Sequence, residues 1–125
     1  MSFQAQQGRR TRLADLVIDN GVSESNFLNS DQYSMFTHLA ILAPATLTDT
    51  VRGEVNSDPS ADQTSDTQWK AYHPITPGTL VAFPVSVVTV IPAPPTHGFR
   101  LNSDSNEGAK RTFKCWGLRI PRSAA

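Results

Sequence analysis

The amino-acid sequence predicts an all-β protein, an antiparallel β-sandwich of jelly-roll-like form with about seven or eight strands. Short runs rich in β-branched and aromatic residues recur along the chain, and Pro, Gly, Asn and Asp turns separate them. No segment has the apolar spacing of an amphipathic helix of three turns. The 125 residues fit one domain. We therefore expect an extended, polar N-terminal arm over residues 1–12 and a single sandwich domain over residues 13–125.

The first half of the domain contains three strand candidates. Residues 13–18 form an apolar run that ends at the turn signal Asp19-Asn20-Gly21. Residues 35–42 are apolar on both faces, which predicts a strand buried between two layers and leaves a buried helix as the alternative. Residues 51–56 alternate between apolar and polar, the period of a half-exposed strand. The mostly polar residues 23–29 yield no strand prediction.

The second half begins with a polar loop at residues 57–67 and a short strand at residues 68–72. Two β-branched runs follow, residues 80–83 and 85–91. Pro92 cannot donate to a ladder, so the second run is expected to end there.

Two further strands complete the sandwich, a short one at residues 99–101 and a long one at residues 111–120. In the long strand Phe113, Cys115 and Gly117 share one face, and Trp116 lies on the other.

Charge is distributed unevenly although the 11 basic and 11 acidic residues cancel. The net charge is +3 over residues 1–14, −8 over residues 15–66 and +5 over residues 67–125. If the ends do not pack against the middle, the protein presents one acidic and one basic face, which suits head-to-tail or lattice contacts.

Residues with catalytic or metal-binding potential are not grouped in the sequence. The histidines at positions 38, 73 and 97 lie apart; His38 is expected to be a core residue, and the other two lie in turns. Cys115 is the only cysteine and is expected to be a small buried core residue. Asp58, Asp62 and Asp66 lack the spacing of a calcium loop and are expected to be solvated. The sequence therefore predicts no enzyme, no catalytic or metal site and no cofactor.

Basic residues form two small clusters without interleaved aromatic residues, so nucleic-acid binding is not predicted. We expect these clusters to contact acidic protein surfaces; they are Arg9, Arg10 and Arg12, and Arg111, Lys114, Arg119 and Arg122. No apolar stretch has the length of a signal peptide's core or a membrane span, so we expect a soluble protein that does not bind membranes.

The order of strand ends and turns resembles small β-sandwich virion proteins encoded by tailed bacteriophages. Their pattern is roughly Asn-Gly-x-Ser-x-Ser, a strand ending in Pro-Ala-x-Leu-Thr, a strand ending near Ser-x-Asp, then Arg-x-x-Ser and Arg-Thr-Phe. The corresponding segments here are VIDNGVSESN (17–26), LAILAPATLT (39–48), VRGEVNSD (51–58), QWK (68–70), FRLNS (99–103) and RTFKCWGLR (111–119). The match covers residues 15–120, but Ser-x-Asp is replaced by Asn56-Ser57-Asp58 and the loop after it is longer and more acidic.

This resemblance implies a virion structural protein made in the cytoplasm of a bacterial host. The role we expect is that of a capsid decoration (cement) protein, a homo-oligomer (dimer or trimer) that binds the major capsid protein or other virion proteins. Phe3, Arg9, Arg10 and Arg12 would be its partner contacts. A tail, neck or head-fibre component is the alternative.

A carbohydrate-binding module for host attachment is an alternative of another class. It needs exposed aromatic platforms, and Trp69 and Tyr72 are the plausible pair. The competing interpretation is that both are core or interface aromatics.

Overall fold

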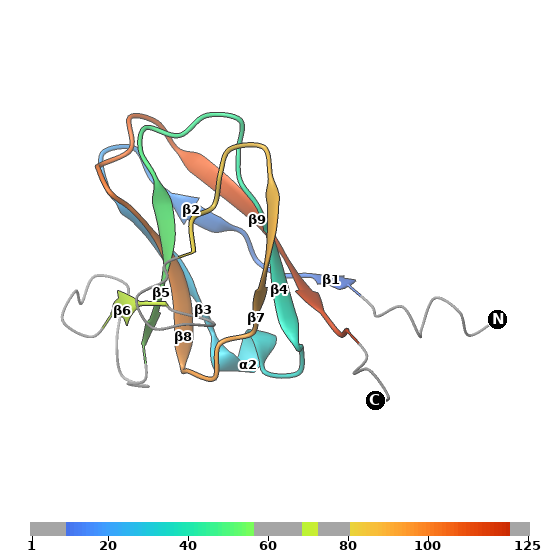
Figure 1. The fold of residues 1–125 in the computed structure, drawn as a ribbon. Coiled ribbons are helices and arrows are strands. Elements are labelled where there is room, and N and C mark those ends of the chain that lie inside the picture. The colour runs from blue at the N-terminus through green and yellow to red at the C-terminus, as the bar shows by residue number, and fades with distance from the viewer. Residues whose placement is uncertain (1–9, 57–68, 73–80, 121–125) are drawn as a thin grey trace.

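The computed structural model describes residues 10–56, 69–72 and 81–120, and it confirms the all-β antiparallel fold (Figure 1). The described residues form nine strands and one helical turn, α2 (Ser30–Tyr33). The strands are β1 (Arg10–Arg12), β2 (Leu16–Ile18), β3 (Glu24–Asn29), β4 (His38–Leu42), β5 (Val51–Asn56), β6 (Lys70–Ala71), β7 (Val88–Pro92), β8 (Gly98–Ser103) and β9 (Arg111–Leu118).

The strands make one curled sheet in the order β6-β5-β8-β3-β2-β9-β4-β7, and β1 also pairs with β9. The curl brings two layers face to face: β5, β8 and β3 on one side of the core, and β9, β4 and β7 on the other (Figure 1). Among the described strands, only β2 pairs with a strand of each layer, namely β3 and β9. The described part of the chain is therefore a sandwich joined along one side by β2 and open along the other.

The core lies between the layers, where each strand sends every second side chain inward. Phe99 lies at its centre, with ring centroids 6.1 Å from Tyr72 and 6.4 Å from Phe83. Burial of each such side chain stabilises the fold by about 1.5–3 kcal/mol. At the open side, the Tyr72 hydroxyl donates to the carbonyl of Pro92 at 2.8 Å and so connects the two layers.

Several sequence predictions are confirmed. The strand at residues 51–56 has the expected bounds, and the long last strand buries Phe113, Cys115 and Gly117 while Trp116 faces outward. The expected turn contains Gly21 with φ +87°, a conformation that glycine adopts without strain.

The absence of a strand prediction at residues 23–29 was wrong, because β3 occupies this polar segment. A register shift against β8 lies between Glu24 and Phe27, and there the Ser25 hydroxyl accepts from Leu101 N–H at 2.9 Å. The Asn26 side chain accepts from Val17 N–H at 2.6 Å and donates to the Asp15 carbonyl at 3.0 Å, so it replaces ladder bonds between β2 and β3. Polar side chains thus supply part of the bonding of β3 to both of its neighbours.

Several other strand bounds and one histidine differ from expectation. β2 begins at Leu16 rather than at residue 13, and residues 81–83 of the expected strand make only an isolated bridge, between Ala82 and Arg52. β4 begins at His38 rather than at residue 35, and His38 is half-buried rather than a core residue. The run expected at 85–91 becomes a turn followed by β7, because Ser86 has φ +58° and its N–H bonds to the Pro44 carbonyl at 3.0 Å.

The segment before β4 turns back onto β9 instead of extending the strand. The ring of Phe36 packs directly over Gly117, where an added Cβ would lie 2.3 Å from a ring atom. Glycine at position 117 therefore makes room for this contact.

Candidate protein-binding face

The layer formed by β7, β4, β9 and β1 has an outer face that no described element covers. Antiparallel partners share a face, so the registers assign its members. We define the β4 face as the outward residues of these strands: Arg10, Arg12, His38, Ala40, Leu42, Val88, Val90, Pro92, Lys114, Trp116 and Leu118.

The centre of the β4 face is apolar. One cross-strand row runs Val90, Ala40, Trp116 and ends at Arg12, and the row beside it joins Val88, Leu42 and Lys114. The outward face of a sandwich layer is normally polar. β4 is therefore apolar on both faces, as the sequence predicted, yet the described chain supplies only one covering layer.

The exposed part of the β4 face lies toward β7. Val88 and Val90 are 52% and 49% exposed, and Val85 and Val87 in the preceding turn are 43% and 45% exposed. Contiguous exposed apolar side chains of this kind mark interaction surfaces more often than single ones do.

The side of the β4 face toward β9 and β1 carries basic residues. Arg10 and Lys114 are exposed, and neither forms an ion pair with a carboxylate of the described residues. The unpaired cations make the rim of this face positive.

Arg12 has a different role from these cations. Its guanidinium donates to the carbonyls of Leu13 and Cys115, pairs with Asp15 at 2.5 Å, and lies 5.1 Å from the ring centroid of Trp116. Arg12 therefore fixes β1 against β9 and orients Trp116, and its charge is largely satisfied within the chain.

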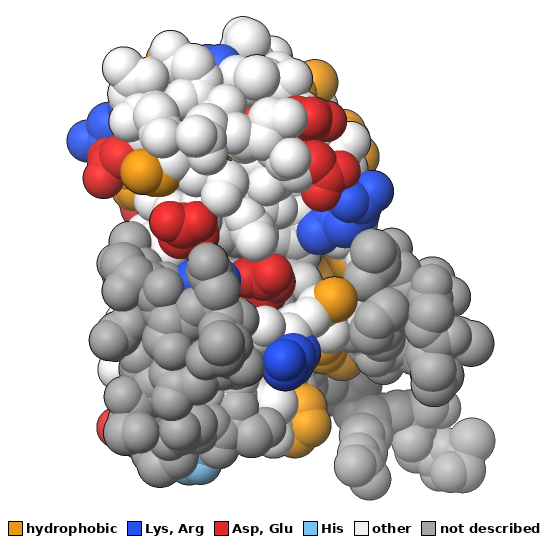
Figure 2. Space-filling view, turned by 90° about the vertical axis from the view of Figure 1, so that its left-hand side faces the viewer, with side chains coloured by type: hydrophobic (Ala, Val, Ile, Leu, Met, Phe, Trp, Pro, Cys, Tyr) orange, Lys and Arg blue, Asp and Glu red, His pale blue; other side chains and the backbone are white. Residues whose placement is uncertain are grey.

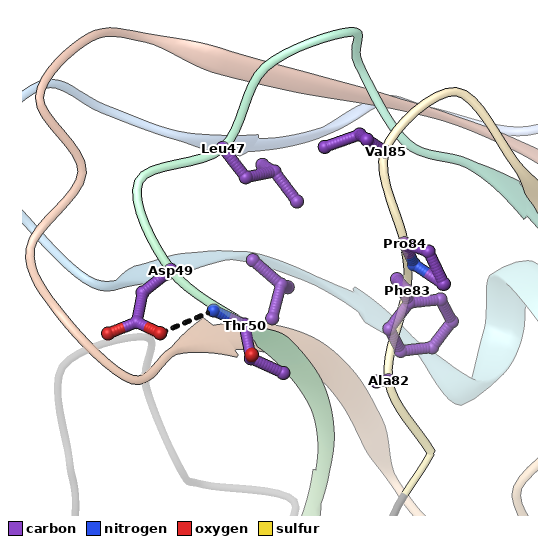
Figure 3. Close-up of a pocket in the computed structure, with 8 residues that line it drawn as sticks. Leu47, Asp49, Thr50, Ala82, Phe83, Pro84 and Val85 are labelled. Carbon is purple, nitrogen blue, oxygen red and sulfur yellow. Dashed lines mark hydrogen bonds between the residues drawn. The ribbon is translucent and has the colours of Figure 1, made fainter.

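A pocket of about 400 Å³ opens beside Val85 at one end of the sandwich (Figure 3). Its walls come from residues 47–51, which lead into β5, and from residues 82–85. Leu47 and Val85 point toward the opening, whereas the Asp49 carboxylate points away from it (Figure 3). The pocket thus offers an apolar lining that continues from the exposed valines.

The Asp49 carboxylate accepts hydrogen bonds from the Ser105 hydroxyl at 2.6 Å and from Thr50 N–H at 2.8 Å, and these bonds lower its pKa. The Asp49 carboxylate therefore stabilises the loops that surround it and is not directed into the pocket. A general base would need a free lone pair directed at a substrate in the pocket.

Glu107 holds together the loops at the same end. It is 1% exposed and accepts hydrogen bonds from Thr48 N–H at 2.8 Å, the Ser103 hydroxyl at 2.7 Å and the Arg111 guanidinium at 2.9 Å. Burial alone would raise its pKa, but these hydrogen bonds outweigh burial and lower the pKa from 4.5 to about 2. Glu107 is therefore ionised and stabilises the wall of the pocket.

The outer face of the opposite layer is polar, and its charges pair within the chain. Glu54 on β5 contacts the Arg100 guanidinium on β8 at 2.8 Å, and its second oxygen accepts from the Asn102 amide at 3.1 Å. Arg52 pairs with Asp104 at 2.6 Å. Figure 2, which views the molecule from this side, shows acidic side chains with basic ones beside several of them.

The sequence-predicted site residues separate into three groups. Phe3 and Arg9 lie outside the described residues, as do Asp58, Asp62 and Asp66. Arg10 and Arg12 lie on β1 at the edge of the β4 face.

Trp69 and Tyr72 form the third group, and they are buried: 3% and 7% exposed. The Arg100 guanidinium lies 4.7 Å from the Trp69 ring centroid, and Phe27 packs against the same ring with centroids 5.5 Å apart. Neither side chain is exposed as the carbohydrate-binding alternative requires: Tyr72 packs in the hydrophobic core, and Trp69 is buried against Phe27 and Arg100.

Groups that could perform chemistry are scattered in the described part of the chain. No three His, Cys, Asp or Glu side chains among the described residues cluster in a way that could hold a metal ion. Cys115 is fully buried, as predicted, and burial raises its pKa to about 12, so its thiol is not activated as a nucleophile. Across the described ranges there is no helix of the length and hydropathy needed to cross a bilayer.

Comparison of the sequence with models of known protein families finds no match, and no curated protein matches it either.

Proposed function

We propose that this protein is a virion structural protein of a tailed bacteriophage and that it acts as a capsid decoration (cement) protein. The observation that carries the proposal is the β4 face, an apolar surface that the described residues leave uncovered and whose Arg10 and Lys114 pair with no described carboxylate. The resemblance of the strand ends to those of phage virion proteins is the reason for proposing a phage virion as the assembly to which this face binds. In this setting the partner is the major capsid protein, and the mature protein resides on the virion after synthesis in the host cytoplasm.

The proposed mechanism is energetic. Apolar burial at Val88, Val90 and Leu42 would supply affinity, since each Å² removed from water contributes about 25 cal/mol. Arg10 and Lys114 would select an acidic rim on the partner and exclude a basic one. A protein that binds only the assembled lattice stabilises that lattice by linkage, and repetition over the shell adds avidity.

The pocket beside Val85 gives the proposed contact a place for one apolar side chain of the partner. Its volume of about 400 Å³ is sufficient for a side chain such as Leu or Phe. Because Asp49 points away, the pocket presents no charge to an incoming apolar group.

The test compares capsids that lack the protein with capsids to which it has been added back. Wild-type protein is expected to raise the temperature at which heated capsids release DNA, measured with an intercalating dye. Arg10→Glu/Lys114→Glu is expected to lose most of this protection because it reverses two unpaired rim charges. Equal release with and without the wild-type protein would overturn the proposal.

The matched control is Lys70→Glu/Lys110→Glu, which makes the same change in net charge away from the β4 face. Both lysines are exposed. The control is expected to protect capsids as wild type does. If both double variants lose protection equally, net charge and not the β4 face determines binding.

A tail, neck or head-fibre component remains the alternative within the virion. Copy number separates the roles, since a decoration protein is present in hundreds of copies and a tail component in about a dozen or fewer. Quantitative mass spectrometry of purified virions measures this ratio. The carbohydrate-binding alternative has no exposed aromatic pair at Trp69 and Tyr72 to support it.

A further inference from the structure

The edge strand β7 lacks the features with which proteins usually protect a sheet edge. The sequence contains no Asp, Glu, Lys or Arg between Lys70 and Arg100. Exposed edges are normally shielded by charged side chains, by bulges or by proline within the strand. β7 pairs with β4 along five residues without a register shift, and Pro92 stands only at its end.

The hydrogen bonds show which backbone groups of β7 remain available. Ala43 N–H donates to the Val87 carbonyl, and Ala93 N–H donates to the Thr37 carbonyl, so the odd-numbered residues of β7 bond toward β4. In an antiparallel pair the alternate residues direct their N–H and C=O groups away from the partner. The even-numbered Val88 and Val90 therefore direct theirs toward the free edge.

We propose that β7 pairs edge to edge with β7 of a second copy of this chain, antiparallel and around a two-fold axis. This arrangement is β-augmentation, in which backbone hydrogen bonds join two sheets. We choose a second copy of the chain as the binding partner of this edge because the residues of β7 are uncharged and mostly β-branched. A copy brings no like charge against it, whereas a charged peptide would lose solvation without finding a counter-charge.

The local sequence selects one register. When Val88 of one copy faces Val90 of the other, two pairs form and each exchanges two backbone hydrogen bonds, which gives about four bonds. A two-fold axis that passes through Val88 or through Val90 gives fewer backbone hydrogen bonds between the two copies. Ser86 already uses its N–H in the turn, and Pro92 has no N–H and uses its carbonyl with Tyr72. Thr89 then faces Thr89 of the second copy at the axis.

The dimer would join two layers into one sheet and place two β4 faces side by side. Val88 and Val90 would line the join, so the apolar centre of the combined surface would be continuous. The proposal does not rest on the phage assignment, because it concerns the purified chain alone.

The first test replaces Val90 with proline. Val90→Pro removes an N–H that points to the free edge, so the bonds to β4 are kept while the two bonds that the Val90 N–H groups donate to the second copy are lost, which halves the backbone bonding across the axis. Light scattering during gel filtration is expected to give twice the 13.6 kDa chain mass for wild type and 13.6 kDa for Val90→Pro. Val90→Thr keeps the N–H and the β-branch and is expected to stay dimeric.

Circular dichroism and thermal unfolding establish that Val90→Pro remains folded. A monomeric wild type, or a folded Val90→Pro that stays dimeric, overturns the proposal. If Val90→Pro does not fold, the cross-linking test below decides.

The second test uses Thr89→Cys. Residues opposite each other in a non-hydrogen-bonded pair have Cα atoms about 4.5 Å apart, within the range that a disulfide spans. Mild oxidation is expected to convert most of this variant into a covalent dimer on a non-reducing gel. The buried Cys115 does not compete, because its thiol is inaccessible.

The control for this test is Asn106→Cys, an exposed position in the loop between β8 and β9. It is expected to cross-link only slowly. Equal yields from the two variants would show random collision and contradict the register. Because no capsid is involved, either result leaves the decoration role to its own test.

Discussion

The outer faces of the two layers differ in whether their charged side chains find partners within the chain. On the β5–β8 side, Arg100 is 1% exposed, and its guanidinium pairs with Glu54 and lies over the ring of Trp69. On the β4 side, Lys114 is exposed and pairs with no carboxylate of the described residues. The first face pairs Arg52 and Arg100 with carboxylates of the chain, whereas the described residues leave Lys114, Arg10 and the apolar centre of the second face without such a partner. A charged residue on the outer face of a layer therefore indicates a protein-binding surface only where no oppositely charged side chain of the same chain pairs with it.

The largest expected effect is on the self-satisfied face. Glu54→Ala removes the carboxylate that lies 2.8 Å from the buried Arg100 guanidinium, and removing one member of a buried pair costs about 3–5 kcal/mol. Urea unfolding measures the change. Arg52→Ala, which breaks the more exposed pair with Asp104, is the control and is expected to cost about 0–1 kcal/mol. Equal costs would show that burial does not distinguish the two pairs.

A second effect tests how closely the β4 layer is packed from inside. Gly117→Ala forces a Cβ against the Phe36 ring and is expected to cost about 1–3 kcal/mol, as overpacking does. Phe36→Leu combined with Gly117→Ala is expected to cost less than the sum of the two single changes. Additive costs would contradict the contact, since residues that touch do not behave independently.

A third effect concerns the loops at the pocket end of the sandwich. The pKa of Glu107 is lowered in the fold to about 2 from 4.5, so the unfolded state takes up a proton first as pH falls. Its contribution to stability is complete above about pH 4.5 and is lost between there and pH 2. Unfolding free energy measured across this range is expected to fall more steeply for wild type than for Glu107→Gln. Parallel curves would contradict the assignment.

The smallest expected effect sharpens the contrast between the faces. Reversing the exposed Lys114 to Glu is expected to change stability by no more than about 0.5 kcal/mol, as surface substitutions usually do. The same change should weaken partner binding. A large loss of stability would show that Lys114 serves the fold and not a partner.

The sequence predicted well wherever a local pattern decides the structure. The alternation at Val51–Asn56 and the two faces of the last strand follow from side-chain period alone. The apolar character of β4 on both faces was also visible, and it is the property that makes the β4 face unusual.

The sequence could not predict features that depend on distant partners. β3 was missed because Asn26 pairs with backbone atoms of residues 15 and 17, which no local pattern reveals. Glu107 lies in a polar loop and gives no sign of burial until the loops at 47–49 and 103–111 meet. The basic rim appeared in the sequence as separate clusters, and only the strand registers place Arg10 and Lys114 on one face.

The single strand shared by both layers has a consequence for how the protein opens. Backbone hydrogen bonds of β2 join the two layers along one side. Along the open side, by contrast, the layers are connected by side-chain contacts such as the hydrogen bond from the Tyr72 hydroxyl to the Pro92 carbonyl. Amide deuteration should therefore advance from β6 and β7 inward, and the protons of β2 and β9 should exchange last.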